Sequence, residues 1–245
     1  MTEITRTALR DALHEAASVV ISIVGKLDDD AIKAPSELPG WTRGHVLAHI
    51  AGISNAMARQ LEFAARGERI ELYDGGYEGR TKAIELAAGH SLEEHRAAVS
   101  EGISRALNAF DALDESGWNR PISYCDGTVF DGGLALWREL VIHASDLGTG
   151  RGPETWSRTF CGHLVRFLEA RVPADYRLVL QPTGLPQSTI GTGHTSIVVT
   201  GMLTDIAAWL AGRTPSLGSL RASAAADGVE LPELLPWPAG VPAAS

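Results

Sequence analysis

The feature that most constrains the fold is a helical periodicity that recurs in four long segments before residue 150. In the first segment apolar residues recur every three or four positions, at Leu9, Leu13, Ala16, Val20, Val24 and Leu27. The same spacing runs from Val46 to Leu61, from Val99 to Leu113 and from Leu136 to Leu147. Four amphipathic helices of this length can bury their apolar stripes against one another, which predicts an antiparallel four-helix bundle.

The connections between these helices also carry signals. Ser91 and Glu94 have the spacing of a capping box at the start of the third long helix. The connection over residues 67–91 is long and holds a shorter helix near 79–88, and long loops in compact domains are often functional. Two Asp-Gly pairs within residues 119–133 predict a short hairpin over one end of the bundle.

The pattern changes after the glycine-rich segment 148–153. Two helices and two strands are predicted beyond it, the helices over residues 156–172 and 202–211 and the strands over 176–180 and 196–200. A loop or a long hairpin joins the strands. We therefore predict two domains, a helical bundle over residues 1–150 and a small α/β domain over residues 151–245.

Composition narrows the class of protein. The 245 residues are 44% hydrophobic and 21% charged, as expected for a globular chain. A net charge of −9 argues against nucleic acid or an anionic membrane as partner, because phosphate contacts need clustered Lys and Arg. No signal peptide or apolar run of about 18 residues is present. The two cysteines, Cys125 and Cys161, cannot form a disulfide framework, and we expect a cytoplasmic monomer.

Ionisable residues on two of the helices are the candidates for chemistry. The second helix carries His45 and His49 one turn apart, after the N-cap residue Thr42. The fourth carries Glu139 and His143, which stack on one face beside the apolar stripe. Burying an unpaired carboxylate is costly, and a divalent metal is one partner that offsets the cost. Two histidines and one glutamate are a known ligand set for catalytic zinc, with a fourth position left open.

The spacing leaves other interpretations open. A Glu-x-x-x-His pair is more often a solvent-facing ion pair, and His45 could be an ordinary first-turn histidine. His49 lies one turn deeper on the apolar stripe, which favours it as the ligand without excluding His45. Asp146, nearly one turn beyond His143, could orient that ring, although a plain helix-end acid is the commoner role.

Two segments carry a resemblance to a known family. GWTRGHVLAHIAG at residues 40–52 and LWRELVIHASDLG at 136–148 resemble the two signatures of the mycothiol-dependent maleylpyruvate isomerase family, within the wider DinB-like group of metal-binding bundles. The resemblance extends over nearly the whole chain, and residues 196–213 also fit the family's second domain. It implies a DinB-like four-helix bundle followed by a small α/β domain with some likeness to sterol carrier proteins.

The resemblance also implies site residues and cofactors. The family pattern makes His49, Glu139 and His143 the metal ligands, with zinc as the metal and mycothiol as the thiol cofactor. It places a functional arginine in the loop after the second helix, and the counterpart here is Arg80. The plain alternative for Arg80 is a surface arginine at a helix start.

The implied enzyme is a cis-trans isomerase that converts maleylpyruvate to fumarylpyruvate. Zinc would ionise the thiol, the thiolate would add to the cis double bond, and its expulsion after bond rotation would give the trans isomer. The fork of Arg80 would pair with a substrate carboxylate. The expected partners are thus a small-molecule substrate and a low-molecular-weight thiol. Two alternatives stay open: a mycothiol S-transferase acting on another electrophile, and a non-catalytic metal- or ligand-binding module.

Overall fold

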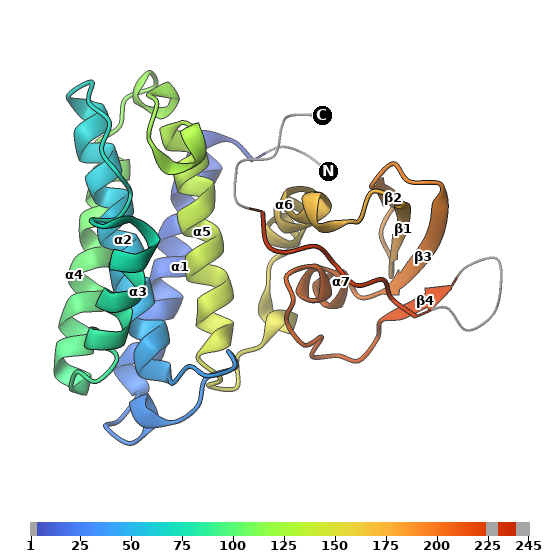
Figure 1. Cartoon of the computed structure of the whole chain (residues 1–245), viewed down its shortest axis with the longest axis horizontal. Coiled ribbons are helices and arrows are strands. Elements are labelled where there is room, and N and C mark those ends of the chain that lie inside the picture. Colours follow the sequence, from blue (N-terminus) through green and yellow to red (C-terminus); the bar gives the residue numbers. More distant parts are fainter. Residues whose placement is uncertain (1–3, 224–229, 239–245) are drawn as a thin grey trace. The chain divides into compact units, whose positions relative to one another are not determined.

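The computed structural model describes residues 4–223 and 230–238, which form two compact units (Figure 1). One unit spans Thr5–Gly150 and is helical. The other consists of Ile4 and the described residues from Arg151 onward. The second unit contains a four-stranded sheet. The predicted fold class, a helical domain followed by a small α/β domain, is confirmed. None of the described helices is long and apolar enough to cross a membrane.

The first unit is a bundle of four long helices with a fifth, shorter one. These helices are α1 (Arg6–Lys26), α2 (Arg43–Ala65), α3 (Gly76–Ala87), α4 (Leu92–Asp111) and α5 (Val129–Asp146). Both α1 and α2 pack against α4 and α5, so α1 and α2 occupy opposite corners of the bundle. The predicted stripes form the core, with residues at most 1% exposed that include Leu9, Leu13, Val20, Val46, Ile50, Val99, Ile103, Leu136 and Leu140. Each such side chain contributes about 1.5–3 kcal/mol of hydrophobic stabilisation.

The bundle is not fully antiparallel, contrary to the sequence-based prediction, because α2 and α4 run in the same direction. Near the start of both helices, a Cβ on Gly44 would lie 3.3 Å from Nε2 of His95. Near their ends, Arg105 pairs with Glu62 at 2.7 Å. The chain returns along α2 in two parts, first the loop that follows α2 and then helix α3. Helix α2 has 23 residues and spans about 35 Å. This return segment lies against α2 (Figure 1) and supplies side chains to the site described below.

Capping boxes start three of the long helices. The predicted box of Ser91 and Glu94 is present at α4. At α2 the box is formed by Thr42 and His45, with the histidine ring in the position where glutamate is usual. Each box satisfies backbone N–H groups that the first helical turn leaves without partners.

The predicted hairpin over residues 119–133 is wrong in its second half. A single antiparallel bridge joins Pro121 to Thr128, and α5 then begins at Val129. The pair Asp131-Gly132, taken as a turn signal, lies in the first turn of α5. The carboxylate of Asp131 accepts the Thr128 N–H at 2.8 Å and so completes a capping box. Local chemistry at the helix start thus outweighs the turn preference of Asp-Gly.

The second unit combines a mixed four-stranded sheet with helices. Its elements are α6 (Arg158–Phe167), β1 (Tyr176–Pro182), β2 (Ser188–Ile190), β3 (Thr195–Gly201), α7 (Leu203–Leu210) and β4 (Arg221–Ser223), and the strand order is β2-β1-β3-β4. The strands predicted at 176–180 and 196–200 are not a hairpin pair, since β1 and β3 are parallel with Leu178 opposite Ile197. The segment between them adds β2, antiparallel to β1. Helix α7 packs on β1, β3 and α6.

Candidate metal centre

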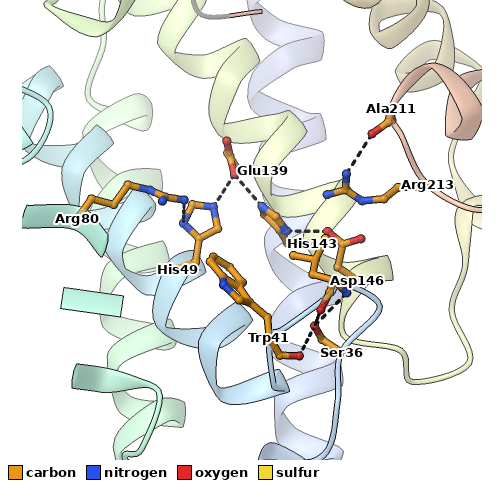
Figure 2. A network of polar contacts seen from close by, with 10 residues as sticks. Ser36, Trp41, His49, Arg80, Glu139, His143, Asp146, Ala211 and Arg213 are labelled. Carbon is orange, nitrogen blue, oxygen red and sulfur yellow. Dashed lines mark hydrogen bonds and ion pairs between the residues drawn. The ribbon is translucent and has the colours of Figure 1, made fainter. Parts of the chain in front are cut away.

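Three predicted ligands from two helices converge on one point (Figure 2). His49 lies on α2, and Glu139 and His143 lie one turn apart on α5, which packs against α2. Oε2 of Glu139 is 2.8 Å from Nε2 of His49 and 3.0 Å from Nε2 of His143. All three ligand atoms lie within 4.8 Å of one another, and among the described residues no other group of three His, Cys, Asp or Glu side chains does this.

Access to the three side chains is uneven. The side chain of His49 is 5% exposed and that of His143 is 12% exposed, whereas Glu139 keeps 32% of its side-chain surface in contact with solvent. The two histidines are therefore held by the bundle core. A water-borne ligand can reach the cluster from the side of the carboxylate.

The structure distinguishes His49 from His45. Nδ1 of His45 lies 3.2 Å from the Thr42 N–H and 2.8 Å from the Thr42 hydroxyl, so this ring caps its own helix. The other ring nitrogen of His45 faces Glu85 at 3.5 Å, on α3. Of the two histidines that the spacing left open, His49 joins Glu139 and His143.

Asp146 is more than a helix-end acid. Its Oδ2 lies 2.8 Å from Nδ1 of His143, within hydrogen-bond distance. Burial alone would lower the pKa of His143, but the carboxylates of Asp146 and Glu139 outweigh it and raise this pKa to about 9. Burial would likewise raise the pKa of Glu139, but hydrogen bonds from His143 and His49 hold it well below its usual range. In the absence of metal, an ionised Glu139 therefore lies beside a protonated His143.

Arg80, predicted from the sequence to be functional, also lies at the cluster. Its Nη2 donates to Nδ1 of His49 at 3.1 Å, from a position on α3 (Figure 2). Burial, then the neighbouring His143 and Arg80, lower the pKa of His49, while its bond to Glu139 opposes them. His49 is accordingly neutral, with Nδ1 as acceptor and the proton on Nε2, facing Glu139.

Trp41 is a neighbour of the site that the sequence analysis did not single out. Its ring meets the His49 ring edge-on, with centroids 5.9 Å apart, and stacks on His45 at the same distance. The Ser36 hydroxyl donates to the Trp41 carbonyl at 2.9 Å, and this bond helps to hold the loop that precedes α2 (Figure 2). The sequence signal that could have identified Trp41 is its position directly before the N-cap residue of α2, close to the two histidines of that helix.

Two tyrosines near Glu139 were also missed. Tyr73, in the loop before α3, interacts with Arg80, whose guanidinium carbon lies 5.9 Å from the centre of the tyrosine ring. Tyr124, in the 3₁₀ turn Tyr124–Asp126, interacts with the buried Arg138 of α5. No periodicity marks a tyrosine in a loop, because its position depends on how distant segments pack.

Comparisons with known proteins agree with this arrangement. Residues 13–148 match the family model described as the mycothiol maleylpyruvate isomerase N-terminal domain, and residues 155–236 match that of the MDMPI C-terminal domain. The chain belongs to this family. Its fold is similar to the crystal structures of the mycothiol-dependent maleylpyruvate isomerase and of a histidine-to-alanine variant of it. Each is 21% identical, with a TM-score of 0.83 over 96% of this chain and 99% of that one, which shows the fold alone. No curated protein sequence matches the chain.

The residues of this family member fit a divalent metal. Two imidazole nitrogens and one carboxylate oxygen are the donors that zinc takes at sites with an open position. Ligand atoms around a tetrahedral zinc stand about 3.3 Å apart, so the pairs at 2.8 and 3.0 Å need only a small opening. Asp146 supplies the carboxylate that commonly orients a ligand histidine. His49, Glu139 and His143 could therefore hold the ion.

Proposed function

We propose that the chain is a zinc- and mycothiol-dependent isomerase that converts maleylpyruvate to fumarylpyruvate. The observation that carries the proposal is the meeting of His49, Glu139 and His143 with Arg80 beside them, in a member of this family. Metal ligands and a fixed cation within one polar site suit a reaction between a thiol and a carboxylated substrate.

His49, Glu139 and His143 would hold the metal and leave a position open. When bound, the metal would supply the ionisation of a thiol, and reversible addition of the thiolate to the double bond would give the isomerisation. Asp146 keeps the proton of His143 on Nδ1, so that Nε2 faces the ligand position. The exposed side of Glu139 leaves a path for thiol and substrate.

Arg80 is the residue that binds the substrate carboxylate in this proposal. A histidine that ligates metal through Nε2 carries its proton on Nδ1 and cannot accept a bond from an arginine. In the metal-loaded chain Arg80 would therefore lose its hydrogen bond to Nδ1 of His49, which is present without metal. The guanidinium is then available to form two parallel bonds to a carboxylate.

One assay separates this function from the two alternatives. The metal-loaded chain is mixed with maleylpyruvate, with and without mycothiol, and the products are followed by proton NMR. The proposal predicts fumarylpyruvate only when metal and thiol are both present, with the thiol recovered unchanged. A stable thiol conjugate would identify an S-transferase. A chain that neither retains metal nor alters substrate would be a binding module.

A further inference from the structure

The two histidines of the candidate metal centre have different partners outside the cluster. Nδ1 of His143 faces the carboxylate of Asp146 at 2.8 Å, an acceptor that suits a ligand histidine. Nδ1 of His49 faces Nη2 of Arg80 at 3.1 Å, and among the described residues Arg80 is the only hydrogen-bond partner of this nitrogen. Arginine has donors and no acceptor. His49 therefore lacks the kind of orienting partner that His143 has.

Both hydrogen bonds of His49 belong to its metal-free state. Nε2 donates to Glu139 at 2.8 Å, and Nδ1 accepts from Arg80. A metal at Nε2 would use the lone pair of that nitrogen, and the proton would then be on Nδ1, where Arg80 offers no acceptor. Neither bond can hold the ring in the orientation that a metal requires.

Two ring contacts of His49 are compatible with either position of its proton. The ring of His143 meets it edge-on, with centroids 4.6 Å apart, but His143 is itself a candidate ligand. The indole of Trp41 is inclined to the His49 ring by 64°, with centroids 5.9 Å apart (Figure 2). Aromatic rings attract one another at such separations. Trp41 is thus the ring contact of His49 that comes from outside the ligand set.

The indole of Trp41 is attached to a backbone that is held on both sides. The Trp41 N–H donates to the Leu38 carbonyl at 3.0 Å, and the Trp41 carbonyl accepts the N–H and the hydroxyl of Ser36, both at 2.9 Å. The next residue, Thr42, is the N-cap of α2. The start of the helix that carries His49 therefore also sets the position of the ring beside it.

We propose that Trp41 is a positioning residue for His49: its indole holds the imidazole with Nε2 facing the metal, as Asp146 does for His143. A side chain that is already held in one rotamer loses little entropy when its ligand atom binds, so metal binding is tighter. The inference rests on the metal centre of the proposed function and on no step of the isomerisation. It applies equally to a transferase or a binding module with the same three ligands.

Zinc affinity of the metal-free chain tests this role. Trp41→Leu should weaken zinc binding about 3–10-fold in competition with a chromophoric chelator, which corresponds to the cost of ordering one free side chain. Trp41→Phe retains an aromatic ring and should recover most of this loss. Ser91→Ala is the matched control, because it removes a capping box at α4 and lowers the stability of the same unit. Its zinc affinity should equal that of wild type.

Nitrogen NMR of the zinc-loaded chain shows which ring is affected. In wild type, His49 and His143 should each show a metal-bound Nε2 and a protonated Nδ1. Trp41→Leu should shift or broaden the signals of His49 and leave those of His143 unchanged, whereas Asp146→Asn should do the reverse. A residue that only packs at the helix start would not produce this selectivity.

The outcomes separate this inference from the proposed function. Wild-type zinc affinity in Trp41→Leu, even with a lower free energy of unfolding, would show an ordinary packing role and overturn the proposal. Equal disturbance of the His49 and His143 signals would also overturn it. Zinc binding that depends on Trp41, without turnover of maleylpyruvate, would reject the isomerase function alone. A wild-type chain that binds no zinc would reject both.

Discussion

Oδ2 of Asp146 lies 2.8 Å from Nδ1 of His143, and this contact determines which ring nitrogen faces Glu139. The aspartate is 1% exposed, and its carbonyl accepts the Glu37 N–H at 2.8 Å, so backbone and side chain are both held. A carboxylate at Nδ1 keeps a proton there and leaves Nε2 as the only nitrogen that a metal can use. It also makes the imidazole a stronger ligand.

Replacing Asp146 should weaken metal binding without abolishing the fold. Asp146→Asn keeps the size of the side chain and removes its charge, so we expect metal affinity to fall about 10–100-fold. Competition with a chromophoric chelator measures this directly. Asp131→Asn is the control on the same helix: it alters the capping box and should reduce stability while leaving metal affinity unchanged. Equal metal affinities in Asp146→Asn and wild type would contradict the orienting role.

Loss of a ligand should remove the metal. His49→Ala and His143→Ala should purify with little bound metal, because two remaining ligands hold zinc poorly. His45→Ala, one turn away on α2, should retain full occupancy, since that ring caps its helix and lies outside the cluster. Elemental analysis gives the occupancy, and circular dichroism shows whether the helices persist. Full occupancy in both ligand variants would refute the site.

Local sequence was enough to predict the long helices and the pair of metal-centre residues that lie on α5. The four-residue spacing of Glu139 and His143 places them on one face of α5 whatever else the chain does. His45 and His49 share a similar spacing; the place of His49 on the apolar stripe favours it, but His45 is excluded only by its capping contacts to Thr42. That distinction depends on side-chain hydrogen bonds at a helix start, which spacing does not report.

Features that depend on distant contacts could not be derived from periodicity. The parallel arrangement of α2 and α4 follows from the return of the chain through α3. Strand β1 pairs directly and in parallel with β3, although β2 lies between them in the sequence. The same return places the Tyr73 ring beside Arg80. Each case pairs segments whose relative direction is set by packing, and residue patterns carry little information on direction.

Arg80→Lys should lose substrate affinity but keep the metal. A point charge cannot replace the two parallel bonds of a guanidinium, so kcat/KM should fall about 10–100-fold, in line with the strength of bonds to charged groups. Metal content should not fall, because a metal-bound His49 cannot accept from Arg80. Arg59→Lys, which alters an ion pair with Asp74 at 2.7 Å, is the control and should keep wild-type kinetics. Unchanged kinetics in Arg80→Lys would return Arg80 to a surface role.

Activity should depend on an added thiol and on neither cysteine of the chain. Cys161 is fully buried, and burial raises the pKa of its thiol to about 12, so it cannot serve as the nucleophile. A double variant, Cys125→Ser with Cys161→Ala, should turn over at a rate close to wild type when mycothiol is supplied. Without a small thiol, neither protein should react. Thiol-independent turnover that disappears in the double variant would show that a cysteine of the chain takes part.

The stability of the helical unit should fall in mild acid because of His95 on α4. Nε2 of His95 is buried without a hydrogen-bond partner among the described residues, and burial lowers its pKa below the ordinary value of 6.5, despite a contact with the Ala88 backbone. His90 and Glu94 are the neighbouring titratable groups, with opposite and smaller effects. The unfolded chain therefore binds a proton at a pH where the folded chain does not. Stabilisation by the neutral ring is complete above the unfolded pKa and declines as pH falls through and below it.

Urea unfolding at about pH 8 and about pH 5 measures this effect, since the two values bracket the ordinary histidine pKa. The free energy of unfolding should fall less between these values in His95→Gln than in wild type, because the variant has no ring to protonate. His90→Gln, which removes the exposed neighbouring histidine, should follow the wild-type pH dependence. If His95→Gln and wild type lose the same free energy over this range, the acid sensitivity originates in another group and His95 plays no part in it.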